Sequence, residues 1–96
     1  MAERLNTIVC TFELASLKIN AFEIHEWIHH TLRIPEQDVT MIQVDGIRRQ
    51  VFIKLVNNDS VQKILKDTNG EAKYKHHSGE VSTVGIAVAG LGTKRV

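Results

Sequence analysis

Hydrophobic and polar residues alternate along three stretches of this 96-residue chain, at residues 7–14, 38–44 and 48–55. The side chains of a β-strand point alternately to its two faces, so such a pattern is typical of a strand with one buried face. Two further stretches, a short one at 71–74 and a longer one at 80–89, also have the composition of strands. The pattern therefore predicts a chain built largely around a β-sheet.

Two helical patterns lie between these strands. Asn20 is the predicted N-cap of the first helix, Glu23 is its capping-box partner, and the helix should extend over residues 21–32. Asp59 is the predicted N-cap of the second helix, which should stop at Gly70. The principal elements then follow the order strand, helix, strand, strand, helix, strand.

This order predicts an α+β fold of the ferredoxin-like βαββαβ type, a four-stranded antiparallel sheet with both helices on one face. The other face of the sheet should be free of helices. We expect one domain over residues 1–89, because the chain is too short for two cores. Residues 90–96 have the composition of a linker that leads to a further domain.

The stretch at 48–55 organises the prediction, because its two faces differ in character. One set of alternate residues is mostly aliphatic and should face the core: Arg49, Val51, Ile53 and Leu55. The other set combines cations, an amide and an aromatic ring: Arg48, Gln50, Phe52 and Lys54. Cations beside a ring are more typical of a surface that contacts nucleic acid than of one that only faces water.

The dipeptide Asp45-Gly46 predicts a two-residue hairpin turn before this strand. Pairing about that turn places Met41 opposite Gln50 and Val39 opposite Phe52. We therefore expect Val39, Met41 and Phe52 to form an apolar strip on the helix-free face.

The net charge of +1 hides an uneven distribution. Residues 1–47 contain three lysines and arginines against seven acidic residues, whereas residues 48–96 contain nine against four. A cationic half favours a polyanionic partner, although an uneven solvated surface is an equal alternative. Cys10 is the only cysteine, which favours a reducing compartment, and no apolar run has membrane-spanning length. We expect a cytoplasmic or nuclear protein with no membrane partner.

The most recognisable chemical motif is H-E-x-x-H, formed by His25, Glu26 and His29. Histidines at i and i+4 can share a zinc ion, but no third ligand is evident and Leu32 stands where the extended motif has glycine. We therefore expect adventitious zinc at most. The histidines at 76 and 77 complete no recognisable ligand set. Because no nucleophile or phosphate-loop motif occurs either, we predict no enzyme and no cofactor.

Residues 48–55 resemble the third strand of RNA recognition motif (RRM) domains, K/R-G-F/Y-G/A-F-V-x-F/Y. Arg48 matches the leading base, Phe52 the second aromatic residue and Ile53 the aliphatic residue. Gln50 stands in place of the first aromatic residue, and Val9 occupies the usual position of the ring on the first strand. The resemblance implies an RRM-like domain that retains one of three stacking rings.

The chain also resembles the N-terminal domain of gag-like CCHC zinc-knuckle proteins encoded by animal retroelements and of their host relatives. Residues 12–14 and 84–96 are the basis of this resemblance. It implies binding of RNA or single-stranded DNA within a larger protein, with possible self-association.

These observations lead to one hypothesis and one alternative. The hypothesis is a divergent RRM-like module that binds single-stranded nucleic acid weakly, with lysines at 73 and 75 extending the charge if they share the face. The alternative is a protein interaction or self-association module of the same fold that uses the strip of Val39, Met41 and Phe52. The predicted nucleic-acid-binding residues are Arg48, Gln50, Phe52, Lys54, Met41 and Val9.

Overall fold

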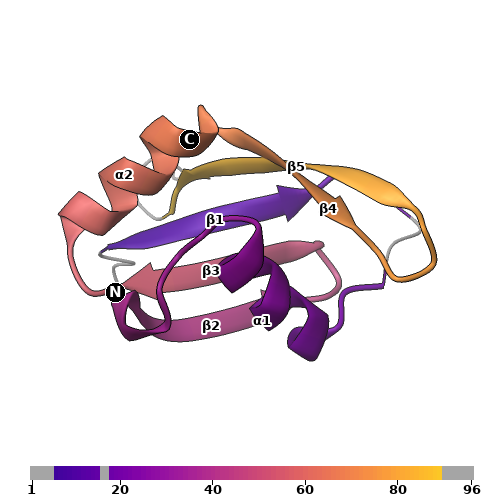
Figure 1. Cartoon of the computed structure of the whole chain (residues 1–96). Helices are drawn as coiled ribbons and strands as arrows, with labels where there is room; N and C mark the ends of the chain where they lie inside the picture. Colours follow the sequence, from indigo (N-terminus) through magenta and orange to yellow (C-terminus); the bar gives the residue numbers. More distant parts are fainter. Residues whose placement is uncertain (1–5, 16–17, 90–96) are drawn as a thin grey trace.

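A computed structural model describes residues 6–15 and 18–89 of the chain. In chain order its elements are β1 (Thr7–Phe12), α1 (Ala21–His30), the short 3-10 helix η1 (Glu36–Asp38), β2 (Val39–Asp45), β3 (Gln50–Leu55), α2 (Asn58–Thr68), β4 (Glu71–Lys75) and β5 (Val81–Val88). The predicted α+β class is confirmed (Figure 1). The predicted linker at 90–96 lies outside the described residues.

The sheet has five strands rather than the four predicted, in the order β2-β3-β1-β5-β4, and every neighbouring pair is antiparallel. The prediction of a four-stranded ferredoxin-like sheet is therefore wrong. The difference arises at β4, which pairs with β5 from Glu71 opposite Gly85 to Lys75 opposite Val81. Tyr74 of β4 is only 2% exposed, so this strand belongs to the core and is not a surface extension of the turn.

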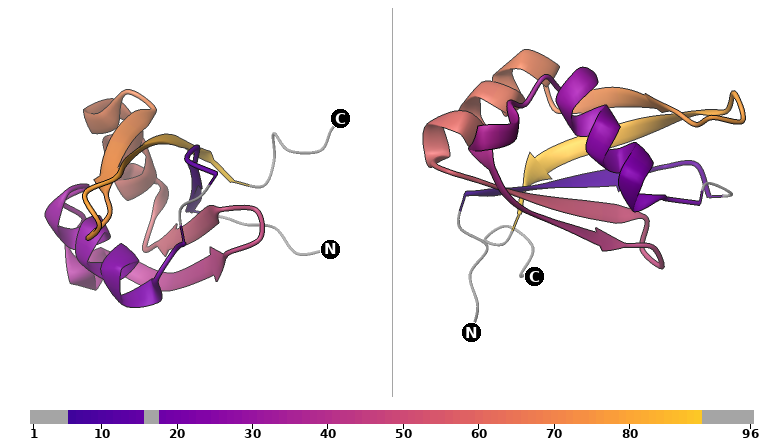
Figure 2. Two further views of the ribbon diagram at one scale, coloured as in Figure 1. Left: turned by 90° about the vertical axis from the view of Figure 1, so that its right-hand side faces the viewer. Right: turned by 60° about the horizontal axis from the view of Figure 1, so that its bottom comes forward.

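Both helices pack on the same face of the sheet (Figure 2). The core between the helices and the sheet contains Ile8, Cys10 and Phe12 from β1, Val51, Ile53 and Leu55 from β3, Tyr74 from β4, Val84 and Ile86 from β5, Ile24, Trp27 and Ile28 from α1, and Val61 and Ile64 from α2. The predicted inward parity of β3 is thus confirmed for residues 50–55. No helix in the described part of the chain is long and apolar enough to cross a membrane.

Three aromatic rings join α1 to the β4 side of the sheet. The ring centroids of Phe12 and Trp27 lie 5.4 Å apart, and Tyr74 lies edge-on to both, at 5.3 Å from Phe12 and 5.9 Å from Trp27. Edge-to-face pairs at these distances are favourable beyond the area that they bury. Trp27 Nε1 also donates a 2.8 Å hydrogen bond to the backbone oxygen of Lys73. The cluster therefore fixes β4 against α1.

The β2–β3 hairpin has a longer loop than the predicted two-residue turn. Residues 46–49 form the loop, Asp45 Oδ1 accepts from Arg48 N at 3.2 Å, and Arg49 adopts a left-handed φ of 54°. Gln43 consequently pairs with Phe52. The predicted register, with Met41 opposite Gln50, corresponds to Gln43 opposite Arg48, and a shift by an even number of residues keeps every β3 side chain on its expected face.

Val39 is the exception, and its predicted place on the helix-free face is wrong. The pairing advances by two residues on β2, from Val39 to Met41, while it advances by one on β3, from Leu55 to Lys54. Thr40 is thus an extra residue, whose Oγ1 donates to the Lys54 backbone oxygen at 3.0 Å. A bulge of one residue reverses the facing of the residue before it. Val39 therefore packs against the core.

The helix starts were predicted with unequal success. Asn20 caps α1 as predicted, its side chain accepting from Glu23 N at 3.1 Å. The cap of α2 is Asn57, which accepts from Ser60 N at 2.9 Å, and the predicted cap Asp59 lies in the first turn. Asn57, Asn58 and Asp59 are three consecutive residues with cap chemistry, so the sequence pattern offers no means of choosing among them.

We predict that Asn57→Ala lowers the free energy of unfolding by about 1 kcal/mol, the usual cost of removing an N-cap side chain. Asp59→Ala is the matched control and should cost less, because it removes only a first-turn charge. Urea unfolding followed by circular dichroism measures both. An Asp59→Ala loss equal to that of Asn57→Ala would contradict the assignment of the cap.

The Cys10 thiol should be inert in the folded protein. Cys10 is fully buried on β1, and burial raises its pKa from 9.0 to about 12. Burial favours the neutral thiol, so ionisation of Cys10 does not reduce the stability of the fold below pH 9. Stability is then lost as the pH rises towards 12. Labelling with a thiol reagent at pH about 8 should be fast in denaturant and slow without it; equally fast labelling of the native chain would disprove the burial.

Candidate functional site

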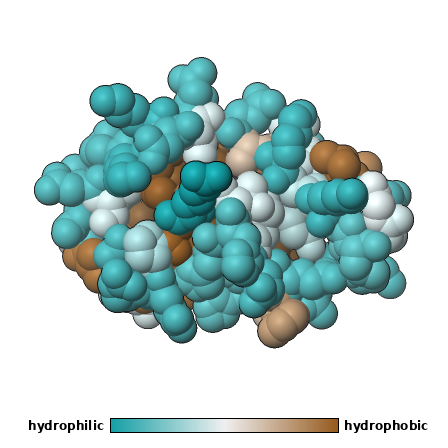
Figure 3. All heavy atoms as spheres, viewed as in Figure 1, coloured by the Kyte–Doolittle hydropathy of each residue, from teal (hydrophilic) through white to brown (hydrophobic). Residues whose placement is uncertain are grey.

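The open face is the side of the sheet that carries no helix. Strand register and alternation place the following residues on it: Met41, Gln43 and Asp45 from β2; Gln50, Phe52 and Lys54 from β3; Thr7, Val9 and Thr11 from β1; Val81, Thr83, Gly85 and Ala87 from β5; and Glu71, Lys73 and Lys75 from β4. The opposite side, on which α1 lies in Figure 1, is mostly hydrophilic with isolated hydrophobic spots (Figure 3).

Five of the six predicted binding residues come together on the open face. Phe52 lies between Val9 of β1 and Gln43 of β2, and it is partly buried. Lys54 is exposed beside Met41, which is 53% exposed. The sixth residue, Arg48, was predicted to lie in the strand but lies in the loop before it. These five residues form one continuous patch over the strands β2, β3 and β1.

Gln50 is already engaged within this patch. Its Nε2 donates to Thr11 Oγ1 at 3.3 Å, and its pairing partner on β2 is Asp45. An amide held in this way is a fixed polar contact point and offers no stacking surface. The patch therefore has one ring, that of Phe52, surrounded by aliphatic and polar side chains.

The cations of the open face lie on both sides of an uncharged middle. Lys54 is on β3, and β4 carries Lys73 and Lys75, whose conditional assignment to this face is confirmed by the register. Lys73 Nζ donates to Thr83 Oγ1 at 2.9 Å and lies 3.9 Å from Glu71 Oε2. Between these lysines, β1 and β5 present threonine, glycine, valine and alanine side chains.

Gly85 marks the middle of this uncharged zone. No heavy atom lies within 4 Å of the place that a Cβ at Gly85 would occupy. The glycine is therefore not required by a close approach of another backbone. Its effect is to leave a low point on the open face between Thr11 and Glu71, its partners on the two neighbouring strands.

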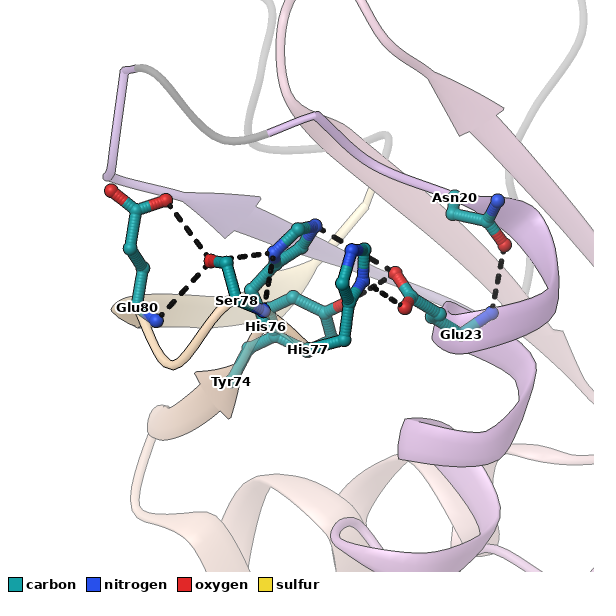
Figure 4. A network of polar contacts seen from close by, with 7 residues as sticks. All are labelled: Asn20, Glu23, Tyr74, His76, His77, Ser78 and Glu80. Carbon is teal, nitrogen blue, oxygen red and sulfur yellow. Dashed lines mark hydrogen bonds and ion pairs between the residues drawn. The ribbon is translucent and has the colours of Figure 1, made fainter.

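A second group of polar residues lies at the other side of the molecule. The Glu23 cluster consists of Glu23, from the first turn of α1, and of His76 and His77, from the turn between β4 and β5 (Figure 4). His77 Nδ1 lies 2.5 Å from Glu23 Oε2, and His76 Nε2 lies 3.8 Å from Glu23 Oε1. The sequence indicated no ligand set for these two histidines, and the structure adds Glu23 as a third side chain of metal-ligating type beside them.

The residues around the Glu23 cluster hold it in position. Tyr74 donates from its hydroxyl to Glu23 Oε1 at 3.3 Å. Burial, together with the negative charge of Glu23, raises the pKa of Tyr74 to about 12, so the phenol remains a donor. On the other side, His76 Nδ1 lies 2.9 Å from Ser78 Oγ, which reaches Glu80 Oε1 at 3.4 Å.

The H-E-x-x-H motif is not part of this cluster. The His25 and His29 rings are 4.8 Å apart, and His29 Nδ1 contacts the backbone oxygen of Ile34 at 2.7 Å. His29 is half-buried and its Nε2 has no hydrogen-bond partner, whereas His25 is exposed. Within the described residues, no carboxylate or third imidazole joins this pair to make a ligand set.

Neither models of known protein families nor curated proteins gave a match to this chain. The resemblances to RRM domains and to gag-like proteins therefore remain predictions that rest on the residues quoted for them. The sequence pattern does not reveal the Glu23 cluster, because Glu23 lies more than 50 positions from the two histidines and because its position also fits a capping residue. The adjacent histidines at 76 and 77 are the one signal that the sequence offers.

Proposed function

We propose that the chain is a divergent RRM-like module that binds single-stranded nucleic acid weakly through the open face. The observation that supports this most directly is the position of Phe52, at the centre of the patch and two residues from the exposed Lys54. In this proposal, β2, β3, β1 and β5 correspond to the four strands of a ferredoxin-like sheet, and β4 is an addition at its edge.

The geometry indicates a path for the bound nucleic acid. A base would stack on the Phe52 ring beside Val9 and Met41, since stacking on an aromatic side chain tolerates any base. The phosphates would then run across the sheet towards Lys73 and Lys75. The strands β3 and β4 are separated by three strand spacings, about 14 Å. The small side chains of β5 lie between them.

The same geometry predicts modest affinity. Each stacked base contributes about 1–3 kcal/mol, and this face offers a single ring. Asp45 and Glu71 also lie on the face and oppose the lysines. Binding should consequently depend on the cations and fall steeply with salt. The proposal assigns no catalytic activity to the chain.

We predict that Phe52→Leu weakens binding of a short labelled single-stranded RNA by about fivefold to 150-fold, the equivalent of one lost stacking contact. Leucine keeps an apolar body at this partly buried position, and circular dichroism would verify the fold. Phe22→Ala is the matched control, because Phe22 is 73% exposed on α1, away from the open face. Fluorescence anisotropy at two salt concentrations measures both variants.

Two results would contradict this model of binding. One is a Phe52→Leu affinity equal to that of the unchanged chain. The other is binding that does not weaken with added salt, since contacts between lysines and phosphates release counterions.

The alternative function is association with a protein or with a second copy of the chain. Met41 favours it, because this apolar side chain is 53% exposed on β2, a strand at the edge of the sheet. The structure reduces the predicted strip to Met41 and Phe52, since Val39 faces the core. The remaining apolar surface is correspondingly smaller.

Self-association through this surface predicts a mass that rises with concentration and returns to the monomer value in Met41→Lys. Ile47→Lys is the control, because Ile47 is 92% exposed in the hairpin loop and lies outside the patch. Sedimentation equilibrium distinguishes the two. A chain that stays monomeric at high concentration, or that dissociates equally in both variants, would exclude self-association through Met41.

A further inference from the structure

We propose that Glu23, His76 and His77 form a zinc-binding site that links the first turn of α1 to the β4–β5 turn. These residues supply one carboxylate and two imidazoles. Zinc is bound in proteins by this type of mixed nitrogen and oxygen set, whereas magnesium and calcium prefer oxygen ligands throughout. The site is separate from the open face, so its test is independent of nucleic-acid binding.

The ligand atoms are already close to the spacing that zinc needs. All three candidate atoms lie within 4.8 Å of one another. In a tetrahedral site with bonds of about 2.0–2.2 Å, neighbouring ligand atoms are about 3.3–3.6 Å apart. The separations of Glu23 from His77 and from His76, 2.5 and 3.8 Å, fall on either side of that range. Small side-chain rotations would therefore complete the site, and Figure 4 shows both imidazoles turned towards the carboxylate.

The surroundings also supply the outer hydrogen bonds that metal sites use. A histidine that binds metal through one nitrogen donates from the other, which fixes its tautomer. Ser78 holds the ring of His76: Nε2 faces Glu23, while Nδ1 lies 2.9 Å from Ser78 Oγ and 3.2 Å from the Ser78 backbone N–H. Zinc binding through Nε2 would use the tautomer in which Nδ1 donates to Ser78 Oγ. Glu23 is oriented by the Tyr74 hydroxyl and by the cap that holds its backbone N–H. Two of the three ligands are thus positioned without the metal.

Exposure determines what the fourth ligand would be. The side chains of His76 and Glu23 are 14% and 26% exposed, while that of His77 is 71% exposed. The remaining coordination position therefore opens towards solvent on the His77 side and would hold water. One carboxylate and two neutral imidazoles leave a net charge of +1 on the complex, which this partly hydrated location tolerates.

The competing explanation of the same contacts is a hydrogen bond between Glu23 and a protonated His77, with no metal. Both arrangements bring His77 Nδ1 to the carboxylate. They differ in the state of the imidazole nitrogens, because zinc requires a lone pair on His77 Nδ1 and on His76 Nε2 whereas the ion pair places a proton on Nδ1. A measurement that reports on the nitrogens can therefore separate them.

The experiment uses the tag-free chain, stripped of metal with a chelator and titrated with zinc by calorimetry. We expect one saturable site and, in long-range proton–nitrogen spectra, changes at His77 Nδ1 and His76 Nε2. His77→Gln and Glu23→Gln should each weaken binding by about tenfold or more. Glu23→Gln keeps an oxygen to accept from Tyr74, and His77 is exposed, so both variants should fold.

His25→Gln and His30→Gln are the matched controls, since both histidines are exposed on α1 outside the Glu23 cluster. They should leave the affinity for zinc unchanged. The proposal is overturned if no saturable binding occurs, if His25→Gln abolishes binding while His77→Gln does not, or if zinc changes the nitrogen signals of His25 and His29 alone.

Discussion

The docking of β4 onto α1 is the constraint on which the rest of this structure depends. Trp27 donates to the backbone of Lys73 and packs with Phe12 and Tyr74, so a helix residue fixes the edge strand directly. A buried indole N–H without a partner would be costly, which makes this bond as much a requirement as a gain. Without this bond and the packing of Tyr74, β4 would be held mainly by its ladder with β5.

The docking of β4 onto α1, together with the alternation of side chains, determines which residues of β4 lie on each side of the sheet. Alternation along the strand turns Tyr74 inward to the aromatic cluster and leaves Lys73 and Lys75 on the open face. The turn that follows then brings His76 and His77 to the start of α1. The proposed nucleic-acid surface and the proposed zinc site thus both depend on β4, which carries two lysines of the surface and leads into the turn that carries the two histidines. A change that loosens β4 should affect both.

Local pattern was sufficient where one strand's own alternation decides the outcome, and insufficient where two segments must meet. Val51, Ile53 and Leu55 face the core as predicted, since an error of loop length shifted the register by an even number of residues. The prediction for Val39 was wrong because the bulge at Thr40 is a property of the strand pairing and has no signature in either strand alone. The same holds for Glu23, whose carboxylate meets residues more than 50 positions away.

The bulge at Thr40 has a consequence for the outer edge of β2. A regular edge strand offers an uninterrupted row of backbone donors and acceptors, on which another extended chain can pair. An extra residue near the start of β2 interrupts that row, and the opposite edge, β4, is only five residues long with charged side chains at three of them. Neither end of the sheet is a good template for adding strands. Pairing with strands of other molecules, and growth into fibrils, are therefore disfavoured at both edges.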